Sequence, residues 1–210
     1  NLFTNEWVMI IGPKYKICRR LGSGVFDQCQ SQKFMLSEAK KTKVAKKGPR
    51  KQVSEYGQQL NEKQKIRFSY GISEKQLGNY VEEATSSKGS VASEKLFELL
   101  ETRLDNTIYR LGLASTRRLA RQMASHGHFL VNGTKTNVPS YRLKVGDKVS
   151  VREGSKSSVL FLDVDKKLEK FQTPVWLSFN AGKLEAEVKG KPKKEDAFLD
   201  FNTVLEFYSR

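Results

Sequence analysis

Cysteine, histidine and long apolar runs are scarce in this chain of 210 residues. Its two cysteines, Cys18 and Cys29, are too few for a disulfide framework and fit a reducing compartment. The longest apolar run near the start covers residues 7–11, which is too short for a membrane span or a signal core. The sequence therefore predicts a cytosolic protein or a soluble protein of an organelle. Because residues 1–8 carry no recognisable pattern, Met9 is a candidate for the true start.

Positive charge is abundant, and it is concentrated toward the N-terminus. The chain has 38 Lys and Arg against 23 Asp and Glu, a net charge of +15. Residues 40–51 hold seven basic groups and no acid, and they form either a solvated mobile tail or a segment ordered by phosphates. Nucleic acid is the expected partner. A membrane surface fits less well, because no Trp/Leu-rich amphipathic face accompanies the charge.

Residues 115–127 form the most informative segment, because at about 100° per residue they wind into a helix with two faces. The apolar face consists of Leu119, Ala120, Met123 and Ala124. The polar face consists of Arg117, Arg118, Arg121, Gln122 and Ser125. Such a helix rests on a core and offers fixed hydrogen-bond donors to an anion.

Three further segments have helical patterns. In residues 54–70 the spacing directs Tyr56, Leu60 and Ile66 toward a core and places three basic side chains outside. Those basic side chains are Lys63, Lys65 and Arg67. Ser73 and Gln76 make a capping box that opens a helix, which fades near the linker candidate 86–90. Apolar residues recur at helical steps over residues 94–111, which predicts one helix closed by Gly112.

Short strands are expected after the two-faced helix, which Gly127 ends. Residues 128–131 read as a strand, and Asn132-Gly133 supplies the turn into a second strand through Lys135. A third strand surrounds residues 149–151. Two helices and this sheet make a compact module over about residues 94–153. Another short helix is expected in residues 156–172, and strands or other ordered structure in residues 174–178 and 199–208.

Several of these motifs resemble the S-four RNA-binding module. The matching segments are residues 103–112, 115–128, 131–133, 139–142 and 145–147. Flanking motifs resemble the bacterial-type small ribosomal subunit protein S-four family. They are residues 12–14, 18–20, 62–65, 70–72, 176–177 and 206–210, so the resemblance covers nearly all of residues 12–210.

The resemblance implies an α+β protein: a mainly helical first domain completed by C-terminal segments, and an inserted S-four-type module of two helices packed on a small twisted β-sheet. The expected boundaries are a basic N-terminal extension over 1–51, a helical domain over 52–93 plus 166–210, and the S-four domain over 94–165. It also implies a structural constituent of the small ribosomal subunit that nucleates assembly of the 5′ domain and contributes to the messenger entry channel and to translational accuracy. The implied partners are small-subunit ribosomal RNA, messenger RNA near the entry channel and small-subunit proteins S-five and S-three, with no membrane. A cytoplasmic bacterial ribosome is favoured over an organellar one.

Double-helical RNA is recognised mainly through phosphates and 2′-hydroxyls, which suits arginine. Within the module, the expected RNA contacts are Thr116, Arg117, Arg118, Arg121, Gln122, His126, Asn132, Lys135 and Arg142. Arg103 either reaches RNA or braces Asp105, and Tyr141 either stacks on a base or belongs to the core. Outside the module, the expected contacts are Lys14, Arg19, Arg20, Lys63, Lys65 and Arg67. Lys46, Lys47 and Arg50 are weaker candidates, because a Lys-rich run replaces the usual family pattern there.

Many members of the family resembled here carry four N-terminal cysteines that bind zinc. Cys18 and Cys29 fall on two of these positions, while Tyr15 and Phe34 occupy the other two. Two thiolates do not complete a tetrahedral site. We therefore predict no zinc, and we expect the aromatic pair to replace the metal as a small core.

No catalytic pattern is present, which predicts a protein that is not an enzyme and needs no cofactor. The sequence has no Gly-rich phosphate loop and no nucleophile elbow, and His126 and His128 lack companions at metal-ligand spacing. An RNA-modifying enzyme would need a further catalytic domain, and the 57 residues after Glu153 are too few for one. A free-standing regulator of translation that acts on messenger RNA stays open as the alternative.

Overall fold

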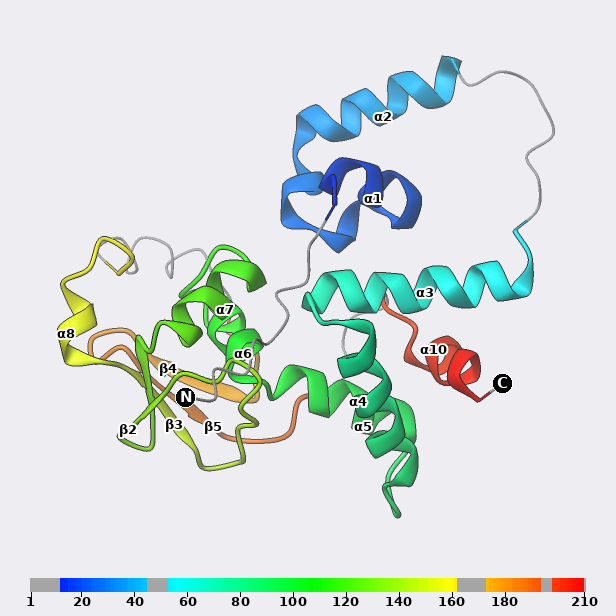
Figure 1. Ribbon diagram of the computed structural model, residues 1–210. Helices are drawn as coiled ribbons and strands as arrows, with labels where there is room; N and C mark the ends of the chain where they lie inside the picture. The colour runs from blue at the N-terminus through cyan, green and yellow to red at the C-terminus, as the bar shows by residue number, and fades with distance from the viewer. Residues whose placement is uncertain (1–11, 45–52, 162–172, 194–197, 210) are drawn as a thin grey trace, which may run out of the picture. The chain divides into compact units, whose positions relative to one another are not determined.

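The computed structural model describes residues 12–44, 53–161, 173–193 and 198–209 (Figure 1). Its mixture of helices and one antiparallel sheet is α+β, as predicted. The chain divides into two compact units, residues 1–93 with 195–210 and residues 94–194. Met9, Lys46, Lys47 and Arg50 lie outside the described residues, as does the helix expected within 156–172 from residue 162 onward.

The first unit begins with helix α1 (Lys14–Leu21), two 3-10 turns, η1 (Ser23–Val25) and η2 (Asp27–Gln30), and helix α2 (Gln32–Val44). Cys18 and Cys29 form a disulfide, contrary to the expectation of two reduced thiols. The turns fold η2 back toward α1 and bring the two Cα atoms to 6.4 Å, within the range that a disulfide spans. The rings of Tyr15 and Phe34 stack with centroids 5.4 Å apart, so the predicted pairing is confirmed, but only Phe34 belongs to the buried core and Tyr15 is 43% exposed.

Helix α3 (Glu55–Tyr70) and helix α4 (Glu74–Ser86) continue the first unit, and helix α10 (Phe201–Tyr208) completes it. The capping box is confirmed: the Gln76 N–H donates to the Ser73 hydroxyl, and the Ser73 N–H donates to the Gln76 side chain. Residues 201–208 form a helix that lies against α3.

The inward face of α3 differs from the sequence prediction. Ile66 is fully buried as expected, but Tyr56 is 53% exposed and Lys63 is only 7% exposed. The reason is the neighbouring helix α10, which the local pattern of α3 does not encode. The Lys63 ammonium lies 4.3 Å from the Phe207 ring centroid and 2.6 Å from a Glu74 carboxylate oxygen, so its charge is compensated.

Five strands make one antiparallel sheet in the second unit, in the order β2-β1-β3-β5-β4. They are β1 (Phe129–Val131), β2 (Thr134–Thr136), β3 (Lys148–Val151), β4 (Leu177–Asn180) and β5 (Glu185–Val188). The short helix α8 (Glu153–Lys156) follows β3. Since β5 pairs with β3, the segment that carries β4 and β5 belongs to the same sheet as the strands of the predicted S-four-type module. The sequence had instead predicted that residues 166–210 complete the helical domain.

The turns of the sheet follow the local sequence. Asn132 and Gly133 both have positive φ, 50° and 81°, which the tight turn between β1 and β2 requires. Gly127 (φ 70°) ends the preceding helix, as predicted. The buried pairs Phe129–Val151 and Val131–Val149 alternate with outward residues along β1 and β3.

The helix predicted over residues 94–111 is interrupted. Helix α5 (Ala92–Glu101) ends, Arg103 takes an extended conformation with ψ 140°, and helix α6 (Leu104–Arg110) begins. At the break, the Leu104 N–H donates to the Tyr141 carbonyl and the Leu143 N–H donates to the Thr102 carbonyl. These hydrogen bonds to a distant loop replace the helical ones, so periodicity alone did not reveal the break.

Replacing Ser73 with alanine should lower the free energy of unfolding by about 1 kcal/mol, because α4 loses its N-terminal hydrogen-bond acceptor. Urea denaturation measures the change. Ser86→Ala is the control, since that hydroxyl only donates to the Glu82 carbonyl on an exposed surface, and it should change stability by less than about 0.5 kcal/mol. Equal destabilisation of both variants would contradict the capping role.

Candidate RNA interface

Helix α7 (Arg117–Ser125) is the two-faced helix of the second unit. The Thr116 hydroxyl caps it by accepting a hydrogen bond from the Leu119 N–H. Ala120, Met123 and Ala124 are buried, so the predicted apolar face is confirmed. The core therefore sets the position of α7 through its apolar face. The polar residues on the other face remain available for other contacts.

The polar residues of α7 form two rows with different environments. Arg117 and Arg121, one turn apart, are half-buried against α6. Arg121 donates from Nε and Nη2 to Asp105 Oδ2 at 2.9 and 2.8 Å. Arg117 donates from Nε to Asn106 Oδ1 at 2.7 Å, and its guanidinium lies 4.4 Å from the Tyr109 ring centroid. This row holds α7 to α6.

Asp105 connects the two helices to the break before α6. Its carboxylate accepts hydrogen bonds from Arg103 Nε and Nη2 at 3.0 and 2.9 Å, in addition to those from Arg121. Arg103 is 1% exposed, so it braces Asp105 and has no surface to offer to RNA. Burial raises the pKa of Asp105, but the charges and hydrogen bonds of Arg103 and Arg121 outweigh burial and hold that pKa below its usual range.

The same network continues to α5. Asn106 donates from Nδ2 to a Glu101 carboxylate oxygen at 2.9 Å, and Arg110 donates to Glu101 from Nε and Nη2 at 2.8 and 2.9 Å. Glu101 is 1% exposed. Glu101 and Asn106 were not among the residues predicted from the sequence. Both residues lie among the apolar positions of residues 94–111. That placement was the available signal that they would be buried and would need polar partners.

The second row of α7 faces solvent. Arg118, Gln122 and His126 follow one another at steps of four residues and are all exposed. Lys135 on β2 is also exposed, and its side chain lies against Gly127, where an added Cβ would come within 2.5 Å of the Lys135 Cε. We call these four residues, Arg118, Gln122, His126 and Lys135, the α7 stripe. They are the predicted site residues that the structure brings together on an exposed surface.

The loops beside the sheet hold three other predicted residues. Asn132 donates to an Asp147 carboxylate oxygen at 2.8 Å and accepts from the Lys148 N–H at 2.9 Å, so it links the turn between β1 and β2 to the start of β3. Tyr141 is 41% exposed, which excludes a plain core position. Arg142 is exposed and forms an isolated bridge with Arg103 through the backbone.

His128 differs from His126 in its surroundings. Its Nδ1 lies 3.0 Å from the Ser155 hydroxyl, and its ring centroid is 6.1 Å from that of His126. Burial, together with the positive charges of His126 and Arg152, lowers the pKa of His128. Within the described ranges, no three His, Cys, Asp or Glu side chains gather as metal ligands would.

In the first unit, most of the predicted cations contact acids or rings. Arg19 pairs with Glu38, Lys65 with Glu62 and Arg67 with Glu74. Lys14 lies over the Phe26 ring at 5.9 Å. Lys63 is buried, so the expectation that it points outward to RNA is wrong. Arg20 is exposed.

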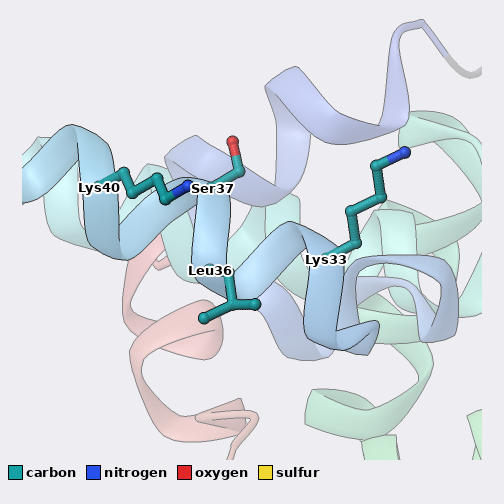
Figure 2. Close-up of a pocket in the computed structure, with 4 residues that line it drawn as sticks. All are labelled: Lys33, Leu36, Ser37 and Lys40. Carbon is teal, nitrogen blue, oxygen red and sulfur yellow. The ribbon is translucent and has the colours of Figure 1, made fainter.

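Helix α2 adds a cationic surface that was not among the predicted RNA contacts. Figure 2 shows Lys33, Leu36, Ser37 and Lys40, which line an open pocket of 430 Å³ along one side of the helix. Their spacing of three, one and three residues is a helical face, which was the available signal.

Comparisons with known proteins identify the domains of this chain. The family described as "Ribosomal protein S4/S9 N-terminal domain" matches residues 9–101, and the family described as "S4 domain" matches residues 102–149. These matches place the chain among ribosomal RNA-binding proteins with an S4 domain. In the part that the structure describes, no helix combines the length and the apolar content needed to cross a membrane.

Whole-chain relatives give the family. Small ribosomal subunit protein uS4 of Caldicellulosiruptor bescii is 42% identical over 205 residues, 95% of this chain and 98% of the relative. The protein of the same name from Chloroflexus aurantiacus is 43% identical over 207 residues, with the same coverage of both chains. The chain belongs to the uS4 family of small ribosomal subunit proteins. Its members are structural components of the ribosome and not enzymes.

Asp105→Ala should lower the free energy of unfolding by about 3–5 kcal/mol, because Arg103 would stay buried without its counter-charge. Urea denaturation at neutral pH measures the change. Glu153→Ala is the control: its carboxylate is 85% exposed and pairs with Lys156, so the expected destabilisation is below about 1 kcal/mol.

The Asp105 effect should also depend on pH. Because the pKa of Asp105 is lower in the folded than in the unfolded chain, its ionised form stabilises the fold above the unfolded pKa. That contribution is lost as the pH falls through the folded pKa. The stability gap between the wild type and Asp105→Ala should therefore narrow in acid, and a gap that does not change would contradict the assignment.

The residues at the four positions that the family resemblance associates with cysteine do not fit zinc, since two are joined in a disulfide and two are stacked aromatic rings. We predict that the purified chain holds no stoichiometric zinc after dialysis against zinc-containing buffer. Elemental analysis per chain measures this, and one zinc per chain would overturn the prediction.

Proposed function

We propose that this chain binds small-subunit ribosomal RNA directly through the α7 stripe. One observation carries the proposal: α7 is held to α6 by one row of arginines while the other row faces solvent beside Lys135. Donors fixed in this way suit the phosphates and 2′-hydroxyls of a folded RNA. The partial positive charge at the N-terminus of α7 favours the same anionic partner.

The first unit contributes a second set of cations to the same RNA. Arg20 and the lysines of α2, Lys33 and Lys40, are exposed. Arg19, Lys65 and Arg67 each contact an acid, so their charge is partly neutralised before RNA arrives. Lys14, Tyr141 and Arg142 stay in the proposed interface, while Arg103 and Lys63 leave it because they are buried.

The finer role rests on membership of the uS4 family. The chain nucleates assembly of the 5′ domain of the small subunit and contributes to the messenger entry channel and to translational accuracy. Its neighbours there are messenger RNA and the small-subunit proteins S-five and S-three, and the ribosome is that of a bacterial cytoplasm. The relatives named above, which are bacterial proteins with the uS4 name, support this role.

Arg118→Ala combined with Lys135→Ala should weaken binding to small-subunit ribosomal RNA and flatten its dependence on salt. If each side chain neutralises one phosphate, the slope of log affinity against log salt should fall by about 0.7–0.9 for each side chain removed. Filter binding at several salt concentrations measures the slope. The matched control is Lys183→Ala with Lys189→Ala, which removes the same charge from exposed lysines beyond the ends of β4 and β5.

Two results would count against the proposal. An unchanged slope in the stripe variant would remove α7 from the interface, and equal changes in both variants would reduce its role to net charge. Sequencing the RNA recovered with the wild-type chain identifies the partner: small-subunit ribosomal RNA is expected. Enrichment of a few messengers would instead support a free-standing regulator of translation.

A further inference from the structure

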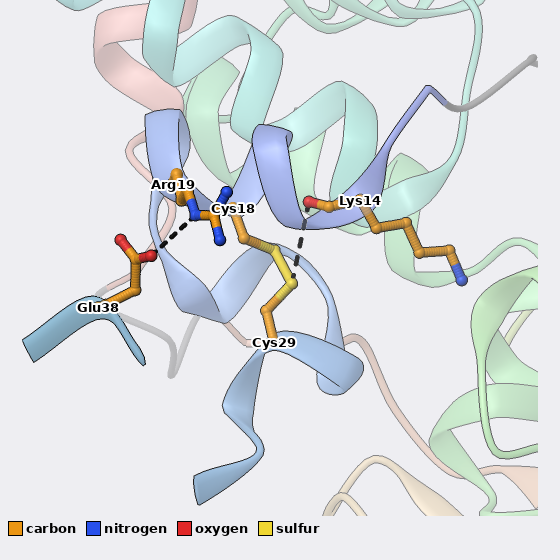
Figure 3. The surroundings of a disulfide bond; sticks show 5 residues. All are labelled: Lys14, Cys18, Arg19, Cys29 and Glu38. Carbon is orange, nitrogen blue, oxygen red and sulfur yellow. Dashed lines mark hydrogen bonds and ion pairs between the residues drawn. A yellow bond between two sulfur atoms is a disulfide. The ribbon is translucent and has the colours of Figure 1, made fainter. Parts of the chain in front are cut away.

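The segment from α1 into the first half of α2, residues 14–38, depends on a very small core; we call it the cysteine lobe. Its buried cluster consists of Cys18, Leu21, Val25, Cys29 and Phe34, and the partly buried Ile17, Phe26 and Phe68 pack against it. A core of this size leaves little apolar area to offset the entropy of ordering the chain, and a covalent link is a usual remedy. The Cys18–Cys29 disulfide provides that link between α1 and η2 (Figure 3).

Neighbouring side chains cover the disulfide. Cys18 is 2% exposed and Cys29 is not exposed at all. Phe34, from α2, is buried in the same cluster and stacks with Tyr15 of α1. Arg19 of α1 donates to Glu38 of α2 at 2.8 Å, which fastens the two helices together outside the cluster (Figure 3). A reductant therefore reaches the sulfur atoms only when the lobe opens.

We propose that Cys18 and Cys29 form a redox site whose disulfide state closes the cysteine lobe and whose dithiol state loosens it. The reacting partner is a small dithiol or the corresponding disulfide. In reduction, a thiolate of the partner attacks one cysteine sulfur and the S–S bond breaks. The second partner thiol then resolves the mixed disulfide. Two electrons and two protons pass to Cys18 and Cys29, and the partner leaves as its own disulfide.

The site matters because the lobe displays cations. Arg19, Arg20 and Lys33 lie on helices that the disulfide and the Phe34 cluster hold in place. Loosening the lobe would disperse these charges and weaken the contribution of the first unit to RNA binding. This consequence rests on the proposed function, whereas the redox site itself does not.

The first experiment counts thiols in the full-length chain. Alkylation and mass measurement should find no reactive thiol after air oxidation and two after reduction with dithiothreitol. Limited proteolysis should then cleave the reduced lobe at least about tenfold faster than the oxidised lobe. Cys18→Ala with Cys29→Ala should be cleaved at the reduced rate with or without dithiothreitol.

A second experiment tests whether lobe opening controls reduction. Phe34→Ala removes a side chain that covers the disulfide, so dithiothreitol should reduce this variant at least about tenfold faster than wild type. Leu36→Ala on the same helix is the matched control, because Leu36 is 57% exposed and outside the cluster. Its reduction rate should match that of the wild type.

The outcomes separate this proposal from the proposed function. Two free thiols after air oxidation, a disulfide between chains, or equal proteolysis of both states would each overturn the redox site without any RNA measurement. If proteolysis responds to dithiothreitol and RNA affinity does not, the redox site stands and its link to RNA binding fails. If the oxidised chain does not bind small-subunit ribosomal RNA, the proposed function fails and the redox site is untouched.

Discussion

The ion pairs of the buried Asp105 with Arg103 and Arg121 are the interaction on which the RNA-binding unit depends. Asp105 is only 3% exposed, and burying a carboxylate without a counter-charge costs much free energy. Its two arginine partners must therefore stay beside it. Arg103 lies at the break between α5 and α6, and Arg121 lies on α7. One carboxylate therefore links the break in the helix to α7 and, together with the buried apolar face of α7, sets which residues of α7 reach solvent.

This arrangement divides a run of arginines that look equivalent in the sequence. Arg117 and Arg121 contribute to the structure of the module, while Arg118 and Gln122 are exposed to solvent. The first unit shows the same division. Glu74 accepts from Lys63, Arg67 and Tyr208, and although burial raises its pKa, these partners hold the pKa below its usual range. The net charge of +15 thus overstates how many cations face a polyanion.

The cysteine lobe solves a different problem, that of a segment too short to build its own core. A disulfide and an aromatic stack occupy the four positions that the family resemblance associates with zinc ligands. Both solutions cross-link α1 to the turns and to α2, but a disulfide responds to thiols and a zinc site responds to chelators. The rarity of cysteine suggested free thiols. That expectation failed because a count of two cysteines says nothing about whether the backbone brings them together.

Local features of the sequence determined the elements that depend on neighbours along the chain. These are the capping box at Ser73, the positive φ turn at Asn132-Gly133, the stop at Gly127 and the apolar face of α7. Motif resemblance predicted the α+β class and the family. Only the tertiary structure decided that Arg103 and Lys63 are buried, that β4 and β5 join the module, and that Cys18 bonds to Cys29. The reason is physical: each of these depends on groups far apart in sequence, whose approach is set by the packing of whole elements and not by periodicity.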